Sequence, residues 1–411
     1  MAAAHTLSGI EFEEPVKIGA SGFQERKWEY FRWMLEERPF CRVKVSLMEF
    51  LYIARYEDCV ELSKDPRFVR NRQNAGGKRK LPVPLPKSLA AMVGSMIYED
   101  GDEHRRLRNL VNRGFRPHAV EKLGKRIDEL THQLLDAAEK EGRIDLLSAY
   151  AQPIPATIIG ELVGVEEREM QHFRDAVRVL TRGFSGWTIA RSVLWDMRKS
   201  GRFIRNVIAQ KRNKPADDIM TNLLSEDEDG DRLSDDELLS MVFLLIVAGH
   251  ETTLHLINNG VLALFQHPEQ LERLRAEPAL IDSAVEEMLR FCSPVQGSKP
   301  AVATEDVVWK DFEIKKGTNL IPNWASANRD PQVFPDPDVF DIARSPNRHV
   351  AFAHGAHFCL GAQLARLETK IAIRSLLARY PNLKLGVEPE QVGLERMPFW
   401  HRHEGYPVIL A

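Results

Sequence analysis

The chain has 411 residues, of which 28% are charged, and its formal net charge is −3. A near-neutral charge argues against a nucleic-acid partner, which requires a concentrated excess of basic residues. The N-terminal stretch carries neither a basic segment nor a long apolar run, so we expect no membrane anchor and a cytoplasmic location. Length alone does not decide the number of domains.

In chain order, the first recognisable elements are strands. Residues 43–54 are rich in Val, Leu, Phe, Tyr and Ile and partly alternate, which predicts a small early β-sheet, and residues 57–64 are typical of a helix. The Gly, Pro, Lys, Arg and Asn of residues 71–87 predict a long loop. Residues 102–380 are mostly helical by period, interrupted by the proline-rich stretch 331–346. The sequence therefore predicts a mainly α fold with small β-sheets (α+β).

The longest apolar helix is predicted to begin after Ser234, which forms a capping-box pattern with Glu237. Residues 241–247 are all apolar, so this helix must be buried. Its middle nevertheless holds small and polar residues, namely Ala248, Gly249, His250, Glu251 and Thr252.

Two interpretations of this polar segment are open. In the structural one, Thr252 bonds to the carbonyl four residues earlier and Glu251 reaches solvent at a kink. In the functional one, a buried acid and a hydroxyl serve chemistry, because buried polar groups need a reason. His250 either meets a polar substrate group or satisfies a helix carbonyl.

A second candidate site surrounds Cys359, which stands between two glycines directly before an amphipathic helical stretch. The positive end of a helix dipole and its unpaired N–H groups would keep a thiolate ionised there. The structural alternative is a small buried hydrophobe, the usual fate of a free cysteine. That alternative is our prediction for the cysteines without such surroundings, which are Cys41, Cys59 and Cys292.

The loop around Cys359 resembles the haem-binding loop of the cytochrome P450 family, of the soluble bacterial type. Phe352, Gly355, Cys359 and Gly361 fill the family pattern at the required spacing. The local departure is Ala353, where glycine is common, and we expect alanine to be tolerated only with a negative φ.

The resemblance implies a single triangular haem-containing domain over residues 1–411. Within it, the β-rich part spans about residues 40–70, the helical core about 102–380 and the haem loop 352–361. The implied cofactor is haem b with Cys359 as the iron ligand, and dioxygen is the co-substrate. Ala248 and Gly249 would then give room for dioxygen and helix distortion.

In this family Glu251 and Thr252 would relay the protons that O–O cleavage consumes, which explains why an acid and an alcohol are needed. Glu287 and Arg290, three apart on one helix, would form a buried charge network with Arg344 that positions the cysteine loop. The same Glu-x-x-Arg spacing recurs elsewhere, and there we predict ordinary surface pairs, at Glu103/Arg106 and Glu272/Arg275.

The haem propionates require cationic or hydrogen-bonding partners. The resemblance assigns this role to His104 and Arg108, one turn apart on a helix, and to His357 in the cysteine loop; the alternative for the first two is a basic surface helix. The family's usual propionate-binding arginine falls on Ala301, and our hypothesis is that Lys299 or a water replaces it.

Family geometry also suggests a mostly apolar substrate pocket, whose candidate lining residues are Met92, Met96, Leu244, Val247, Val295 and Trp400. No flavin or nicotinamide fingerprint is visible, so electrons from NAD(P)H would come through a ferredoxin or flavodoxin and its reductase. The expected basic docking patch for this partner comprises Arg105, Arg113, Arg116 and Arg366.

The expected activity is a monooxygenase that hydroxylates or otherwise oxidises an apolar small molecule. A peroxide-driven haem-thiolate oxidant is a second possibility, although it would not need Glu251 and Thr252. A non-catalytic haem-thiolate sensor or ligand carrier is a third, and it too could do without a proton relay.

Overall fold

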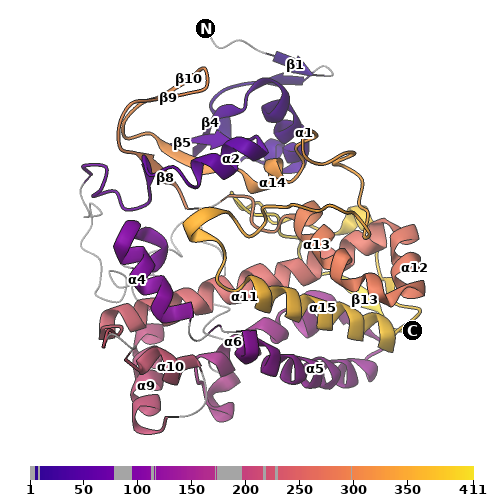
Figure 1. Cartoon of the computed structure of the whole chain (residues 1–411). Helices are drawn as coiled ribbons and strands as arrows, with labels where there is room; N and C mark the ends of the chain where they lie inside the picture. The colour runs from indigo at the N-terminus through magenta and orange to yellow at the C-terminus, as the bar shows by residue number, and fades with distance from the viewer. Residues whose placement is uncertain are drawn as a thin grey trace. The chain divides into compact units, whose positions relative to one another are not determined.

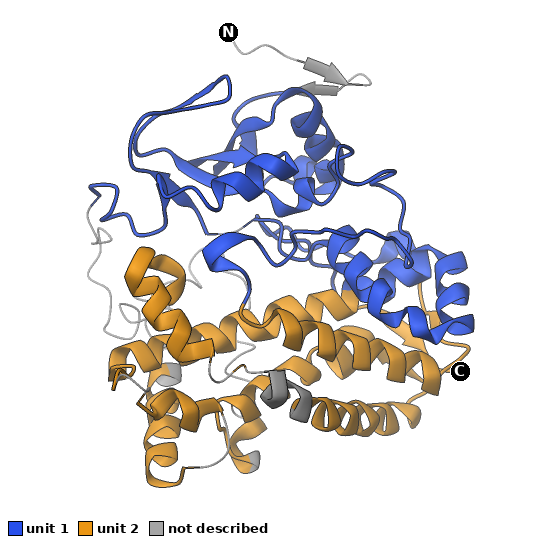
Figure 2. Ribbon diagram, in the orientation of Figure 1, with its two compact units in different colours: residues 1–79, 259–359, 388–404 blue, residues 80–258, 360–387, 405–411 orange. Residues whose placement is uncertain are grey.

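The structure is a computed structural model. In it the chain forms two compact units (Figures 1 and 2). Unit one comprises residues 1–79, 259–359 and 388–404, and unit two the rest of the chain. The prediction of one domain over residues 1–411 stays a prediction. The structure describes residues 5–7, 10–77, 95–112, 115, 117–171, 173, 197–215, 219–226, 230–297 and 299–411.

Unit one is organised around a six-stranded sheet in the order β3-β4-β5-β11-β8-β6. The stretch predicted to be extended forms the antiparallel hairpin of β4 and β5, which turns at Ser46 with φ +54°. The strands of unit one are β1 (His5–Leu7), β2 (Ile10–Phe12), β3 (Val16–Lys17), β4 (Phe40–Val45), β5 (Met48–Ile53), β6 (Phe68–Val69), β8 (Ala301–Ala303), β9 (Val307–Trp309), β10 (Phe312–Ile314) and β11 (Asn319–Pro322).

The period of two along the strands gives this sheet two apolar faces. Tyr52 and Ile321 belong to one buried cluster, whereas Leu51 and Leu320 belong to another. Helix α1 contributes Phe31, Trp33 and other apolar residues to the first cluster. The helices of unit one are α1 (Ser21–Glu37), α2 (Tyr56–Leu62), α12 (Pro268–Ala276), α13 (Ile281–Cys292) and α14 (Trp324–Ala327).

Unit two is mainly helical, with a three-stranded sheet in the order β12-β13-β7. Gly124 of α5 lies against Leu367 of α15, so these two helices pack closely. Unit two contains α4 (Gly101–Asn112), α5 (Pro117–Glu139), α6 (Pro153–Leu162), α9 (Met197–Asn213), α10 (Ile219–Leu224), most of α11 (Asp235–Gln266), α15 (Ala362–Arg379), β7 (Arg143–Asp145), β12 (Lys384–Leu385) and β13 (Pro407–Ile409).

Helix α11 begins as the capping box predicts. The Ser234 N–H donates to Glu237 Oε2 at 2.7 Å, and the Glu237 N–H donates back to Ser234 Oγ at 3.4 Å. Among the described helices, α11 alone is long and apolar enough to cross a membrane, but 67% of its most apolar window is buried inside the structure. This burial is that of a core helix.

Within residues 102–380, which were predicted to be mostly helical, residues 301–322 hold the strands β8 to β11. Each of these strands has three or four residues, which is too short for an alternating pattern to stand out. The proline-rich stretch 331–346 is irregular, as predicted, and residues 71–77 form turns. Residues 78–87 of the predicted loop lie outside the described part of the chain.

Candidate functional site

The loop that carries Cys359 is closed by its own backbone. The Cys359 N–H donates to the Phe352 carbonyl at 2.9 Å, and the Phe358 N–H donates to the Gly355 carbonyl at 3.0 Å. Gly361 is the N-cap of α15, so the cysteine lies just before the positive end of an 18-residue helix. The thiol of Cys359 is exposed.

The other cysteines are buried, as predicted. Burial raises the pKa of the Cys41 and Cys59 thiols well above the usual range and that of Cys292 to about 12. A metal ligand must be a thiolate, which such burial disfavours. Cys359 is therefore the cysteine whose position suits an iron ligand, and the chain fits a haem with sulfur ligation at this loop.

Two residues of the loop have left-handed backbone conformations. Gly355 has φ +73°, and a Cβ there would lie 2.6 Å from the Ser63 carbonyl oxygen, so glycine is required. Ala353 has φ +61°, which contradicts our expectation of a negative φ. Its N–H donates to the Val350 carbonyl at 2.9 Å and its side chain packs against a core cluster, contacts that offset the strain.

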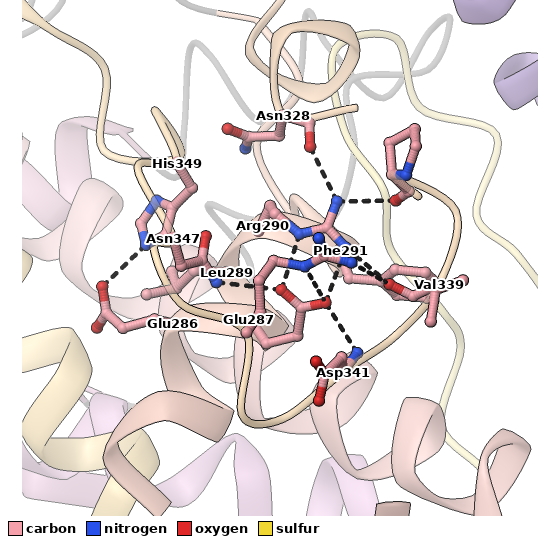
Figure 3. Close-up of polar contacts among 12 residues, drawn as sticks. Glu286, Glu287, Leu289, Arg290, Phe291, Asn328, Val339, Asp341, Asn347 and His349 are labelled. Carbon is pink, nitrogen blue, oxygen red and sulfur yellow. Dashed lines mark hydrogen bonds and ion pairs between the residues drawn. The ribbon is translucent and has the colours of Figure 1, made fainter. Parts of the chain in front are cut away.

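A buried charge network precedes this loop in unit one (Figure 3). Arg290 makes two hydrogen bonds of 2.8 Å with the Glu287 carboxylate, and both side chains are fully buried. Arg344 donates to the same carboxylate at 3.2 Å, as do the Asp341 N–H at 3.0 Å and the Asn347 amide at 3.1 Å. The predicted Glu-x-x-Arg contact, with Arg344 as a second arginine, is therefore present.

The network also holds the chain that leads into the cysteine loop. Arg290 donates to the Asn328 carbonyl at 3.0 Å, and the Asn328 side-chain oxygen accepts from the Val350 N–H at 2.7 Å. Val350 is two residues before Phe352. His349 and Glu286 add a contact of 2.9 Å beside it. These bonds fix the start of the loop.

The two Glu-x-x-Arg pairs that we predicted at the surface, Glu103/Arg106 and Glu272/Arg275, form there. In the Glu272–Arg275 pair the glutamate side chain is 69% exposed. Arg106 pairs with Glu103, and also with Glu237 of α11, and the Glu103 side chain is 49% exposed. The same spacing thus gives a buried network only at Glu287, where several other elements complete it.

One face of α11 is less buried than the rest of this core helix. Leu244, Val247, Ala248 and Thr252 recur at helical spacing and are each at least partly exposed, whereas Glu251 is 7% exposed. Thr252 Oγ1 donates to the Ala248 carbonyl at 2.7 Å, as the structural interpretation predicted. The same interpretation predicted that Glu251 reaches solvent, and the burial of this residue disagrees with that part of it.

Gly249 lies against another helix of unit two. A Cβ at this position would lie 3.1 Å from Ile159 Cδ1, so its small size accommodates α6, and its role in giving room for dioxygen stays a prediction. Helix α11 continues from Asp235 to Gln266, and the local distortion that the resemblance implies stays a prediction. Ile159 gave no signal in the sequence, because it is one apolar residue in an apolar helix.

The predicted propionate partners lie on two elements. His104 and Arg108 are one turn apart on α4, with His104 buried and Arg108 partly exposed. His357 ends the 3-10 turn of the cysteine loop and is partly exposed. Ala301 is buried in β8 within an apolar cluster, and Lys299 is exposed before this strand.

Two substrate-pocket candidates are brought together. Val295 and Trp400 are partners in an antiparallel bridge in unit one. Met96 is buried in unit two. Met92, together with Arg113 and Arg116 of the docking patch, lies outside the described residues.

Comparison with known proteins agrees with this geometry. The cytochrome P450 family model matches residues 18–392. The polyketide biosynthesis cytochrome P450 PksS of Bacillus subtilis is 37% identical, with 92% of this chain and 94% of that protein covered. The cytochrome P450 monooxygenase PikC of Streptomyces venezuelae is 38% identical, with 97% of each chain covered.

Solved structures give the same result. The structure of Bacillus subtilis PksS superposes with a TM-score of 0.89 at 35% identity, covering 96% of this chain and 99% of that one. A myxobacterial P450, CYP267B1, solved in complex with myristic acid, superposes with a TM-score of 0.87 at 35% identity, covering 96% and 98%. The mainly α fold with small sheets is therefore confirmed.

Proposed function

Because the chain belongs to the cytochrome P450 family and is a P450 monooxygenase, we propose that Cys359 is the axial ligand of its haem iron. The observation that carries this proposal is an exposed thiol in a backbone-closed loop just before α15. Phe352, Gly355 and Gly361 shape that loop. Glu287, Arg290 and Arg344 hold the segment that enters it.

When bound, the haem supplies the iron centre at which dioxygen is reduced and cleaved. The Thr252 hydroxyl donates its hydrogen bond to the Ala248 carbonyl, so the lone pairs of Oγ1 can accept a hydrogen bond from another group. Glu251 is the acid nearest to Thr252 in the sequence. Adjacent residues of a helix point in different directions, so the two side chains do not face each other. A water between the two side chains would complete the relay of protons.

The propionates would be held by His104 and Arg108 of α4 and by His357 of the cysteine loop. Ala301 offers neither charge nor a hydrogen-bonding side chain. Lys299 is exposed close to it along the chain, so the replacement of the missing guanidinium by this lysine or a water remains our hypothesis.

The substrate is an apolar small molecule in this proposal. In unit two the candidate lining residues Leu244 and Val247 lie with Ala248 on the partly exposed face of α11, and in unit one Val295 and Trp400 are bridge partners. The CYP267B1 structure holds myristic acid, a carboxylic acid with a long apolar chain. Electrons would pass from NAD(P)H through a reductase and a ferredoxin or flavodoxin in the cytoplasm, with Arg105 and Arg366 as described docking candidates.

The proton relay can be tested with Thr252→Ala, using Thr253→Ala as the matched control because Thr253 is the buried neighbouring threonine. Both variants are assayed with a surrogate ferredoxin, its reductase, NADPH and a compound that shifts the haem spin state. We expect Thr252→Ala to keep consuming NADPH while releasing peroxide instead of product. Unchanged product per NADPH in Thr252→Ala would reject the relay role of Thr252, whereas product formed from added peroxide without NADPH would favour the peroxide-driven alternative.

A further inference from the structure

The segment around Trp400 is paired with the segment around Val295 by more than one bond. The Gln296 N–H donates to the Phe399 carbonyl at 2.8 Å, and the His401 N–H donates to the Pro294 carbonyl at 2.9 Å. These bonds flank the Val295–Trp400 bridge and form a short antiparallel ladder. The ladder therefore places the two proposed substrate-facing side chains next to one another.

The turn that leads into this ladder is strained. Phe399 has φ +67°, a left-handed conformation that is unusual for a large side chain. Such a conformation persists only where the surroundings hold it. The Trp400 carbonyl, which belongs to the residue after Phe399, is therefore a point at which an outside contact decides the shape of the turn.

That contact comes from Lys27 on α1. Its Nζ donates to the Trp400 carbonyl at 3.3 Å, and the residue is 1% exposed. No carboxylate of the described residues forms an ion pair with this ammonium, and burial lowers its pKa to about 7. A buried unpaired charge is unfavourable, and an apolar residue of similar volume would pack there without that cost.

The next carbonyl along the turn is held from another helix. The Asn259 amide of α11 donates to the His401 carbonyl at 2.7 Å, and its side-chain oxygen accepts from the His403 N–H at 3.3 Å. Lys27 and Asn259 thus fix two consecutive peptides. Without Lys27 the Trp400 carbonyl would lose this bond, whereas the ladder, the bond from the Trp400 N–H to the Met397 carbonyl at 3.3 Å and the Arg402 guanidinium, 3.9 Å from the centre of the Trp400 ring, would remain.

We infer that Lys27 is a positioning residue for substrate recognition, which sets the placement of Trp400 and Val295 through the Trp400 carbonyl. This inference rests on the proposed function, because it takes these two side chains to face the substrate. It predicts that Lys27 governs the affinity for ligands large enough to reach the ladder. Ligands that contact only the iron should not respond.

The test uses the haem-loaded full chain with Lys27→Met, which keeps the volume and removes the charge and the donor. Gln24→Met is the matched control, since Gln24 is a buried polar residue one turn earlier on α1 that donates to Ile18 rather than to the turn. Optical titration measures the affinity for imidazole, which is small, and for clotrimazole, which is bulky.

We expect Lys27→Met to bind imidazole as the unmodified protein does and clotrimazole about tenfold more weakly, while Gln24→Met changes neither affinity. A purely structural role for Lys27 would lower the melting temperature without this dependence on ligand size. Unchanged clotrimazole affinity in Lys27→Met, with normal imidazole binding, would overturn the inference alone. Absence of an imidazole shift in the unmodified protein would overturn the haem assignment and the inference with it.

Discussion

Glu368 provides a test of the electrostatics of the helix that follows the cysteine loop. This residue of α15 is 2% exposed, and burial raises the pKa of its carboxyl from 4.5 to about 8. Between these pH values the unfolded chain releases the proton while the folded chain retains it. The contribution of the protonated Glu368 carboxyl to the free energy of unfolding is therefore fully present below pH 4.5 and is lost as the pH rises through about 8.

The size of this loss follows from the shift. A difference of 8 − 4.5 = 3.5 in pKa corresponds to about 5 kcal/mol at about 1.4 kcal/mol for each unit. Glutamine has nearly the shape of the protonated acid and cannot ionise. Glu368→Gln should thus match the unmodified protein near pH 4.5 and exceed its stability by an amount that grows with pH and levels off above about pH 8.

Urea unfolding followed by circular dichroism at several pH values measures this difference. The titration of Lys27 is common to both proteins and cancels. Glu390→Gln is the matched control, because that glutamate is exposed and its replacement should change stability little. A difference between Glu368→Gln and the unmodified protein that stays constant with pH would refute the reasoning.

Three further changes test the network and the loop. Glu287→Ala leaves Arg290 charged and buried and should cost about 3–5 kcal/mol in urea unfolding, with no loss contradicting the network. Glu272→Ala removes the exposed pair with Arg275 and should cost below about 1 kcal/mol, and a larger cost would contradict the difference between buried and exposed pairs. Ala353→Gly should gain about 1 kcal/mol by relieving a positive φ, whereas a loss would show that packing dominates.

Sequence reasoning succeeded where a short pattern has a local physical cause. The capping box of Ser234 and Glu237 and the contact of Glu287 with Arg290 involve residues three apart on a helix, so their spacing alone predicts the bond. The pattern of the cysteine loop is similar, because local backbone conformation requires glycine within it. Gly355 adopts a positive φ, the local conformation for which glycine is preferred.

The remaining features depend on residues that are distant in sequence. Ile159 fills the space where a side chain at position 249 would lie, and no sequence pattern around Gly249 predicts this contact. Lys27 bonds with Trp400 across 373 positions, and a lysine on a mixed helix is ordinarily a solvated residue. Ala353 adopts a positive φ because the loop around it closes that way. Tertiary packing decided each of these three cases.

The central claim is that the Cys359 thiolate binds the haem iron. The most direct measurement is the carbon-monoxide difference spectrum of the purified, dithionite-reduced protein. The account predicts a strongly red-shifted Soret band that is lost in Cys359→His and retained in Cys292→Ser, which alters a buried cysteine. A band at the position typical of histidine or thiol ligation in the unmodified protein would contradict it.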